Sequence, residues 1–517
     1  MGEYLSADVY LEEVASDVRT IEAASTTTCG VIGITARGPI AEPVLITSFA
    51  AYLRNFGSYI ENGWLTYAVE RFFKYVKGRI YVVRTAHYTD ITDPDSYIAV
   101  LASTGGIKDR AGTPVDTITI DAANEGAWGN DISIEVVAST ADPDNEFAIE
   151  VSYDGVPVET FDDLNMTATS RNYVVSRIND GKSAYINVTD LASASTPPEN
   201  RPELGVKTFT LGDDGLTGFD DDDIVGNSGA KTGLYALDAV DDLFLLAAPG
   251  YYSQTVHNGL ITYTESRLDC HAILDSPLGM TPTEVVTYVQ ATAAFNAKYA
   301  FFYYPWIIIR NPNADARMTM PPSGDVLGVI VRTILKRGIH KAPAGIEDGR
   351  LNDVLAMEVD IDKGTRDVLY PARINPIIKK TGRGFLVWGN KTLSAESDWR
   401  DINVRLLFTF LENSIIISTD WAVFEPNDED LWDALGNSIR IFLLGQWRDG
   451  RFYDGGTGDY TQAFYVKCDE ELNTQSVIDQ HKVICEVGVA PKKAAEFIII
   501  RLTQWDGGRL IEELTST

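Results

Sequence analysis

Both ends of this chain read as β-strands, and this feature constrains the fold more than any other. Residues 4–14 run Tyr-Leu-Ser-Ala-Asp-Val-Tyr-Leu-Glu-Glu-Val, and residues 496–505 run Glu-Phe-Ile-Ile-Ile-Arg-Leu-Thr-Gln-Trp, whereas the termini of most domains fray. A strand without a neighbour leaves a row of unpaired backbone N–H and C=O groups. The two ends therefore pair either within the subunit or with adjacent subunits by strand addition. Spacing alone favours pairing within the chain.

Length and composition indicate a globular, multidomain protein. A chain of 517 residues is too long for one core and should form three or four domains. The four cysteines never form a CxxC pair, so neither a zinc site nor a disulfide framework is expected, and a reducing compartment fits best. The longest uncharged apolar segment, residues 299–309, is too short to span a bilayer. We expect a soluble protein without a Sec signal or direct membrane insertion.

The net charge of −31 argues against nucleic acid as a partner, because no basic stripe exists to neutralise phosphates. Residues 91–240 alone contain 27 Asp and Glu against 8 Lys and Arg. This segment should present a face that always meets water.

Three zones follow one another along the chain. Up to about residue 85, strand and helix alternate: residues 29–34, 43–46 and 80–84 look extended, Ser48 can cap a helix that stops at Gly57, and a second helix precedes Gly78. The acidic middle is β-rich, with strands at 117–120, 132–137 and 185–188. It also predicts a hairpin, in which Asp154-Gly155 forms a type I′ turn between residues 147–153 and 156–160.

The third zone predicts a parallel sheet with crossover helices. Residues 243–247, 270–274 and 299–309 are apolar runs typical of strands buried on both faces, and residues 251–267 and 282–297 have helical length. Two amphipathic helices follow, one marked by Trp399 to Phe410 and one that Asn427 caps and Gly450 ends. The fold class is therefore α/β, or mixed α+β.

Candidate chemical motifs are weak. Gly181-Lys182-Ser183 resembles the end of a phosphate loop, but Ser176 stands where the first glycine belongs. Asp275 ends a predicted parallel strand, where enzymes place catalytic groups, although a cap or turn role is favoured. The acids 220–223, 142 and 144 lack the pattern of a calcium loop and are interpreted as solvated. We expect no catalytic residue, metal site or cofactor.

Several ordered blocks resemble contractile tail sheath proteins. Near the N-terminus they are residues 4–6, 9–14, 35–39 and 42–48, and in the C-terminal half they are residues 382–394, 399–405, 410–415, 423–432, 464–469 and 488–498. Only residues 125–130 of the acidic middle look familiar. The motif core consists of Gly384, Trp388, Gly389, Trp399, Asn403, Arg405, Glu425, Pro426, Asn427 and Pro491.

The resemblance implies a mechanical role. Proteins of this family stack as rings of six around an inner tube and shorten to drive the tube through a target envelope, and their terminal arms add strands to neighbouring subunits. It implies copies of the chain itself, a tail tube protein, and baseplate and terminator proteins as partners, and a place in a virion or particle tail assembled in the host cytoplasm. The arm residues would be Val9, Tyr10, Leu11, Glu12, Val14, Phe497, Ile498, Ile499, Ile500 and Leu502.

The expected division has five parts. They are an N-terminal arm (1–22), an inner core (23–88 with 365–496), an inserted acidic β-rich outer domain (89–238), an α/β domain (239–364) and a C-terminal arm (497–517). Other interpretations are the sheath of a headless bacteriocin or extracellular injection particle, an α/β enzyme using the strand ends near Pro249 and Asp275, and a carbohydrate-binding surface protein.

Overall fold

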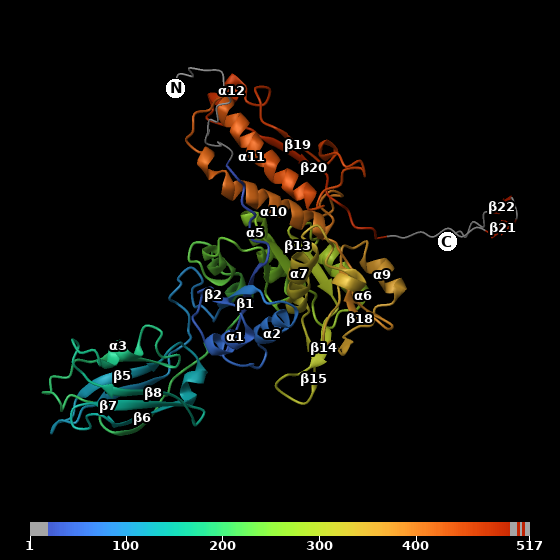
Figure 1. Cartoon of the computed structure of the whole chain (residues 1–517). Coiled ribbons are helices and arrows are strands. Elements are labelled where there is room, and N and C mark those ends of the chain that lie inside the picture. Colours follow the sequence, from blue (N-terminus) through green and yellow to red (C-terminus); the bar gives the residue numbers. More distant parts are fainter. Residues whose placement is uncertain (1–18, 497–503, 507–508, 512–517) are drawn as a thin grey trace, which may run out of the picture.

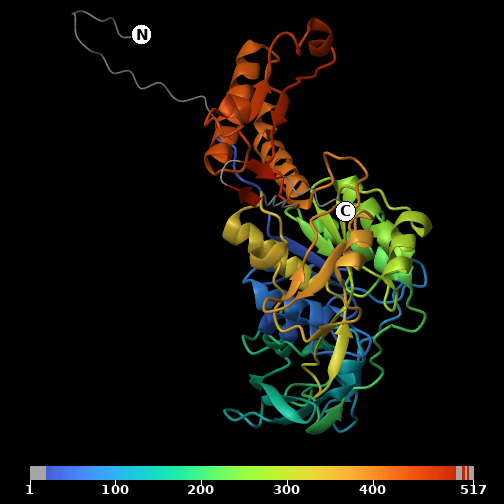
Figure 2. The same cartoon turned by 90° about the vertical axis from the view of Figure 1, so that its right-hand side faces the viewer.

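The computed structural model describes residues 19–496, 504–506 and 509–511. It confirms the mixed α+β class: helices cover a large central sheet, a β-rich part lies at one end of the molecule, and a pair of long helices lies at the other (Figure 1). The view turned by 90° shows the same order from end to end (Figure 2).

The central sheet has eight strands in the order β18-β17-β13-β12-β11-β1-β3-β2. Its strands are parallel except for the two edges, where β2 runs antiparallel to β3 and β18 runs antiparallel to β17. The strands are β1 (Thr28–Gly33), β2 (Val44–Ile46), β3 (Arg79–Arg84), β11 (Leu245–Ala247), β12 (His271–Asp275), β13 (Ala300–Tyr304), β17 (Asn375–Lys380) and β18 (Gly384–Val387).

This sheet differs from the expected division into an inner core and a separate α/β domain. Strand β1 pairs in parallel with β11, with Cys29 opposite Leu245, so residues 23–88 and 239–364 share one sheet. The physical reason is that β1 is buried along its whole length and needs a partner on each side. Strand β3 supplies one partner and β11 the other.

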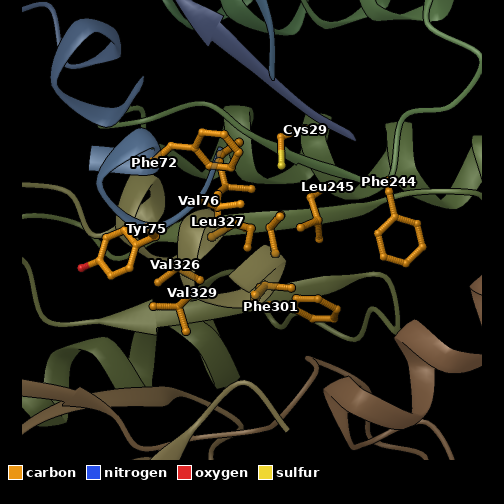
Figure 3. Packing of buried hydrophobic residues seen from close by; sticks show 14 of the residues in the cluster. Cys29, Phe72, Tyr75, Val76, Phe244, Leu245, Phe301, Val326, Leu327 and Val329 are labelled. Atoms are coloured by element: carbon orange, nitrogen blue, oxygen red, sulfur yellow. The ribbon is translucent and has the colours of Figure 1, made fainter. Parts of the chain in front are cut away.

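Helices pack on both faces of the central sheet. Successive strand residues point to opposite faces, so Cys29, Leu245 and Phe301 join α2 and α7 in one core cluster (Figure 3). Ile32, Leu246 and Phe302 face the other side and pack against α5. The helices that cover or flank the sheet are α1 (Phe49–Phe56), α2 (Leu65–Tyr75), α4 (Asp221–Val225), α5 (Gln254–Arg267), α6 (Pro282–Thr287), α7 (Ser323–Arg337), α8 (Gly345–Asp348) and α9 (Lys363–Leu369), with the short turns η2 (Gly233–Ala239) and η3 (Tyr288–Thr292).

Local sequence rules account for several of these boundaries. Ser48 caps α1 by accepting a hydrogen bond from the N–H of Ala51, and Gly57 ends the helix at a φ of 78°. The apolar run 299–309, expected as one strand, is divided at Pro305: β13 stays in the central sheet, and β14 (Ile307–Arg310) joins β15 (Arg317–Met320) and β16 (Ala356–Met357) in a small sheet. Proline has no N–H to donate to a sheet ladder.

The inserted part folds around its own hydrophobic cluster. The predicted hairpin is confirmed, because Tyr153 pairs with Val156 and both Asp154 and Gly155 have positive φ. A three-stranded sheet, β4-β5-β9, and a four-stranded sheet, β10-β6-β7-β8, make up this part. Its elements are β4 (Ser103–Lys108), β5 (Asp116–Ala122), η1 (Ala127–Asp131), β6 (Ile132–Ala138), β7 (Phe147–Tyr153), β8 (Val156–Leu164), α3 (Val174–Ile178), β9 (Ile186–Asp190) and β10 (Gly205–Thr208).

The C-terminal part is an antiparallel pair of long helices with a small sheet beside it (Figure 1). Asp428, rather than the expected Asn427, caps the second helix by accepting a hydrogen bond from the N–H of Leu431. Asn427 instead accepts from the indole N–H of Trp432. The elements are α10 (Ile402–Ser418), η4 (Asp420–Ala422), α11 (Glu429–Arg448), η5 (Tyr460–Gln462), β19 (Phe464–Lys467), α12 (Gln475–Ile478), β20 (Glu486–Val489), β21 (Gln504–Asp506) and β22 (Arg509–Ile511).

Candidate assembly site

Residues 19–24, which span the end of the predicted N-terminal arm, are attached to the C-terminal half of α10 and the turn after it. The backbone N–H of Ala24 donates to Ser414 Oγ, and that of Glu22 donates to Ser418 Oγ, both at 3.0 Å. Residues four apart lie on one face of a helix, so the two serines present a row of acceptors to this segment. The guanidinium of Arg19 stacks over the ring of Trp421, 4.3 Å from its centroid, and extends the attachment to the end of the helix.

The segment that precedes the C-terminal arm is attached to the opposite end of α10. Asn403, on the first turn, donates through Nδ2 to the carbonyl oxygen of Lys492 at 3.1 Å. Lys492 Nζ donates to the carbonyl of Gly450, and Pro491 forms a bridge with Phe452. Asn403 precedes Ser414 by 11 residues and Ser418 by 15, so the two attachment points are separated by about 17–23 Å along the axis of α10.

A polar cluster fixes the last residue before the C-terminal arm. Lys391 Nζ lies 2.8 Å from both Asp401 Oδ1 and Glu496 Oε1, and the hydroxyl of Tyr370 donates to Glu496 Oε1 at 2.6 Å. Burial and the carboxylate of Glu496 raise the pKa of Tyr370, so the phenol stays protonated and remains a donor. Cavities of 500 and 550 Å³ lie beside this cluster, and Glu496 lines both.

In the described part of the chain, the small sheet beside α11 has unpaired edges. Strands β19 and β20 pair only with each other among the residues the structure describes, and the bridge from Phe452 to Pro491 covers one end of β20. A two-stranded sheet is marginal in water unless another element supports it. Here Phe464 belongs to the same core cluster as Ile439 and Phe442 of α11. The sheet is thus held on one face while its edges can accept further strands.

The turn between α10 and α11 exposes a patch of apolar side chains. Phe424 is fully exposed and adopts a φ of 70°, which is uncommon for a bulky residue. Ile416, Ile417 and Val423 are each about 60% exposed, and a cavity of 700 Å³ lies against Val423 and Phe424. An exposed apolar patch of this kind is a candidate contact surface.

Of the sequence-predicted motif core, the residues from Trp399 to Pro491 lie in or beside α10 and α11, whereas Gly384, Trp388 and Gly389 lie on or just after β18 in the central sheet. Arg405 is buried and stacks over Trp399, 4.5 Å from its centroid, while its guanidinium pairs with Glu412. Gly389 leaves no room for a side chain, since a Cβ there would come within 2.6 Å of Asn375. Gly384 begins β18 at a φ of 82°, Trp388 follows that strand, and Glu425 and Pro426 precede α11. These residues stabilise the region that carries both attachment points.

The predicted arm residues lie outside the described residues. These are Val9, Tyr10, Leu11, Glu12, Val14, Phe497, Ile498, Ile499, Ile500 and Leu502. Of the C-terminal arm, the structure describes the antiparallel pair β21–β22, in which Trp505 lies opposite Leu510. Sequence reasoning missed the attachment residues Ser414, Ser418 and Lys391. The four-residue spacing of the two serines on one helix face could have indicated Ser414 and Ser418, whereas nothing in the local sequence marked Lys391.

The weak chemical motifs have structural roles. Asp275 is buried, and its carboxylate accepts from the N–H and hydroxyl of Ser323 at the start of α7, at 2.9 and 2.7 Å. Burial raises its pKa to about 7. It therefore caps α7, not the loop expected to follow it. Ser183 of the apparent phosphate loop donates to Glu159 within the β-rich part.

Within the acidic run 220–223, Asp220 and Asp222 are exposed as expected, whereas Asp223 corrects the expectation of solvated side chains. Asp220 caps α4, and Asp223 is buried, where it accepts from the N–H of Tyr88 and lies 3.0 Å from His87 Nδ1. Across the described ranges, no three His, Cys, Asp or Glu side chains gather as a metal site. No helix in this part of the chain has both the length and the apolar character that crossing a membrane requires.

Comparisons with known proteins agree on one group. A family profile described as phage tail sheath protein central domain matches residues 224–393, and one described as phage tail sheath C-terminal domain matches residues 394–504. Together the two spans cover more than half of the chain.

Three curated proteins are similar in sequence. The tail sheath protein of Vibrio phage KVP40 is 32% identical over 187 residues, which are 36% of this chain and 26% of that protein. The tail sheath protein of Enterobacteria phage T4 is 28% identical over 202 residues, 39% of this chain and 29% of that protein. A putative prophage major tail sheath protein of Pseudomonas aeruginosa is 26% identical over 54% of this chain and 72% of its own length. The chain thus matches under a third of the two phage proteins.

Solved structures share the fold over nearly the whole chain. The helical sheath of the anti-feeding prophage in its contracted state aligns with a TM-score of 0.59 at 20% identity, over 97% of this chain and 99% of that one. The contracted sheath complex of an extracellular contractile injection system aligns with a TM-score of 0.58 at 19% identity, over 98% and 100%.

Proposed function

Because this chain belongs to the tail sheath protein family, we propose that it is the structural subunit of a contractile sheath. In this proposal copies of the chain polymerise as stacked rings of six around an inner tube and shorten to drive the tube through a target cell envelope. Baseplate and terminator proteins lie at the two ends of the assembly. The finished sheath is part of a virion or particle tail assembled in the host cytoplasm. The role is mechanical, so no substrate is turned over.

The observation that carries the proposal is the attachment of both end segments to one helix. Ser414 and Ser418 hold the N-terminal side, and Asn403 holds the C-terminal side, at opposite ends of α10. The two attachment points lie about 17–23 Å apart on one helix, so the arms leave the subunit at separate places, which favours two different neighbours. This favours exchange between subunits over the pairing within the chain that spacing alone suggested.

The acceptor in this proposal is the β19–β20 sheet. Its edges present backbone donors and acceptors, and an added strand would pair with them. Each hydrogen bond contributes about 0.5–1.5 kcal/mol net, so an arm of several residues would make separation of subunits costly. Arms that stay paired can act as hinges while the folded bodies rotate against one another.

The orientation follows from the two ends of the molecule. The acidic β-rich part and the α10–α11 pair lie at opposite ends in both views (Figures 1 and 2). We place the acidic part outward, where a surplus of negative charge repels least, and α11 inward. The exposed residues of α11 include Asp433, Asn437 and Arg440 together with Ile441, a mainly polar surface of the kind that a separable contact with the tube requires.

Contraction in this proposal releases conformational free energy stored during assembly. The extended sheath is a kinetically trapped state, and a trigger lets the subunits rotate and bury new surface. Similar sequences occur in phage tails and in a bacterial prophage, so a tail particle without a head is the alternative assembly.

The test is electron microscopy of the purified full-length protein at several salt concentrations, alongside a variant that lacks residues 1–14. We expect the full-length protein to form ordered tubes and the deletion variant to remain a folded monomer. Deletion of residues 512–517, beyond the predicted strand, serves as the control. Long ordered tubes from the variant that lacks residues 1–14 would show that this arm does not link subunits.

A further inference from the structure

Cys468 and Cys485 occupy facing positions at one end of the β19–β20 sheet. Cys468 directly follows β19, and Cys485 directly precedes β20. The antiparallel register runs from Phe464 opposite Val489 to Lys467 opposite Glu486. One further step in the same register brings the two cysteines opposite each other. Neither takes part in a disulfide.

This placement fits the geometry of a disulfide. Facing residues of antiparallel strands have Cα atoms about 4.5–5.5 Å apart, and disulfides join Cα atoms that are about 4.4–6.8 Å apart. Each thiol also shifts the pKa of the other by hydrogen bonding, which lowers the pKa of Cys468 and raises that of Cys485. A bond between the sulfurs therefore requires little movement of the backbone.

Neighbouring contacts hold the two positions together. Asn473 accepts from the N–H of Ile484 at 2.7 Å, and its amide donates to the carbonyls of Asp469 and Ile484 at 3.1 Å. This one side chain thus ties the residue after Cys468 to the residue before Cys485. On the other side, α11 packs against this end of the sheet: a Cβ at Gly436 would lie 3.5 Å from the Cβ of Cys468, which is ordinary van der Waals contact.

The four cysteines divide into two chemical classes. Cys29 and Cys270 are fully buried, and burial raises the pKa of each thiol, which keeps both inert. Cys468 and Cys485 are partly exposed. The hydrogen bond from Cys485 lowers the pKa of Cys468, so Cys468 is the better nucleophile of the pair.

We propose that Cys468 and Cys485 form a redox-active pair that a small-molecule disulfide, such as oxidised glutathione, converts into an intramolecular disulfide. The Cys468 thiolate attacks one sulfur of oxidised glutathione, forms a mixed disulfide and releases one glutathione thiolate. Cys485 then loses its proton and attacks the Cys468 sulfur, which releases the second glutathione. The two protein thiols are oxidised, and one glutathione disulfide is reduced to two glutathione molecules.

The new bond would close the loop of residues 469–484, which contains α12, and would fix one end of the β19–β20 sheet. A cross-link restricts the unfolded chain and the fraying of the strand ends. If β19–β20 accepts the arms of neighbouring subunits, as proposed above, oxidation makes this acceptor more rigid. That consequence depends on the proposed function, whereas the disulfide itself does not.

The experiment starts from the reduced full-length protein. It is incubated with oxidised glutathione, its remaining thiols are alkylated, and its peptides are analysed by mass spectrometry. We expect a cross-link between Cys468 and Cys485 within one chain, while Cys29 and Cys270 remain alkylated as internal controls. The variant Cys485→Ser should stop at a glutathione adduct on Cys468. Four alkylated thiols in the treated wild type, or cross-links only between chains, would overturn the assignment.

A second measurement separates this inference from the proposed function. Thermal unfolding should show a higher midpoint for the oxidised protein than for the reduced one, and the variant with both cysteines replaced by serine should show no shift with redox state. Electron microscopy of both redox states then tests the link to assembly. If the cross-link forms but no tubes appear in either state, the proposed function fails and the redox pair stands.

Discussion

Arg71 on α2 and Asp325 on α7 form a buried ion pair between helices that are 254 residues apart in the chain. Arg71 Nε lies 2.9 Å from Asp325 Oδ2, and the two side chains are 1% and 0% exposed. Tyr75 donates its hydroxyl to Asp325 Oδ1 at 2.5 Å, and Arg71 also donates to the carbonyl of Asn352. The pair ties the N-terminal α/β segment to the central part of the chain.

Replacing Asp325 by Asn should strongly destabilise the protein. It leaves the Arg71 guanidinium buried beside a neutral group, and breaking a buried pair in this way costs about 3–5 kcal/mol. The free energy of unfolding in urea measures the loss. Asp315→Asn is the control, because its pair with Arg310 is exposed and should contribute nothing measurable. Equal stability of the two variants would contradict the structural role of the pair.

Gly328→Ala on α7 should also destabilise the protein. A Cβ at this position would come within 2.8 Å of the Tyr75 Cβ, where α2 and α7 cross closely. Overpacking of this kind costs about 1–3 kcal/mol. Gly445→Ala on α11 is the matched control, since no atom lies within 4 Å of the added Cβ. There the change should stabilise by about 0.5–1 kcal/mol, because glycine is a poor helix former. Thermal unfolding of both variants tests the contrast.

Asp275→Asn should change how stability depends on pH. Burial raises the pKa of Asp275 from 3.8 to about 7, so the folded state holds a proton that the unfolded state releases. The proton on Asp275 contributes fully to the free energy of unfolding below pH 3.8. This contribution falls by up to about 1.4 kcal/mol per pH unit and is lost as pH rises through 7. The asparagine variant should lack this decline and be at least as stable as the wild type at pH 8. Urea unfolding between pH 4 and 8 measures both curves, and parallel curves would refute the assignment.

Ser414→Ala should loosen the segment that follows the N-terminal arm. The substitution removes the acceptor of the Ala24 N–H, at a cost of about 1 kcal/mol. We expect faster amide hydrogen exchange at residues 22–25 and fewer tubes. Ser438→Ala is the matched control, because Ser438 donates only to the Ala434 carbonyl within its own helix and is equally buried. If both variants assemble alike, the attachment to Ser414 does not matter for assembly.

Ile499→Pro should abolish polymerisation more than folding. Proline removes the backbone donor that the predicted arm strand would offer to a neighbour's sheet. Ile499→Ala keeps that donor and should still polymerise. Electron microscopy shows whether tubes form, and circular dichroism during unfolding shows whether the isolated variants unfold cooperatively. Loss of cooperative unfolding in the proline variant would favour pairing of this strand within its own subunit.

Features governed by nearby residues could be predicted from the sequence. Ser48 caps the start of α1 and Gly57 ends it, as expected, and Asp154-Gly155 forms the predicted hairpin turn. The apolar runs that became β11 and β12 were also recognised. In each case the signal and the structure lie within about ten residues, where hydrogen bonding and side-chain periodicity decide the conformation.

Predictions that depended on distant partners were wrong or missing. The run 299–309 was expected to be one strand, and the acids 220–223 were expected in solvent, although Asp223 is buried against residues 87 and 88. The candidate site shows the same limit, since the motif residues around α10 and α11 were identified but their attachment role was not. The link from Ala24 to Ser414 spans most of the chain, and the link from Lys391 to Glu496 joins two separate segments.

The sequence by itself determined the fold class and the family, because both rest on short ordered blocks of residues, and it predicts the terminal strands, which stay a prediction. Only the tertiary structure decided that β1 and β11 share a sheet, that Arg71 meets Asp325, and that α10 holds both end segments. The physical reason is that burial and hydrogen-bond satisfaction are properties of the packed whole. A buried strand or charge must pair with another group, and that partner can lie far away in the sequence. The residues next to the strand or charge do not show which partner it will be.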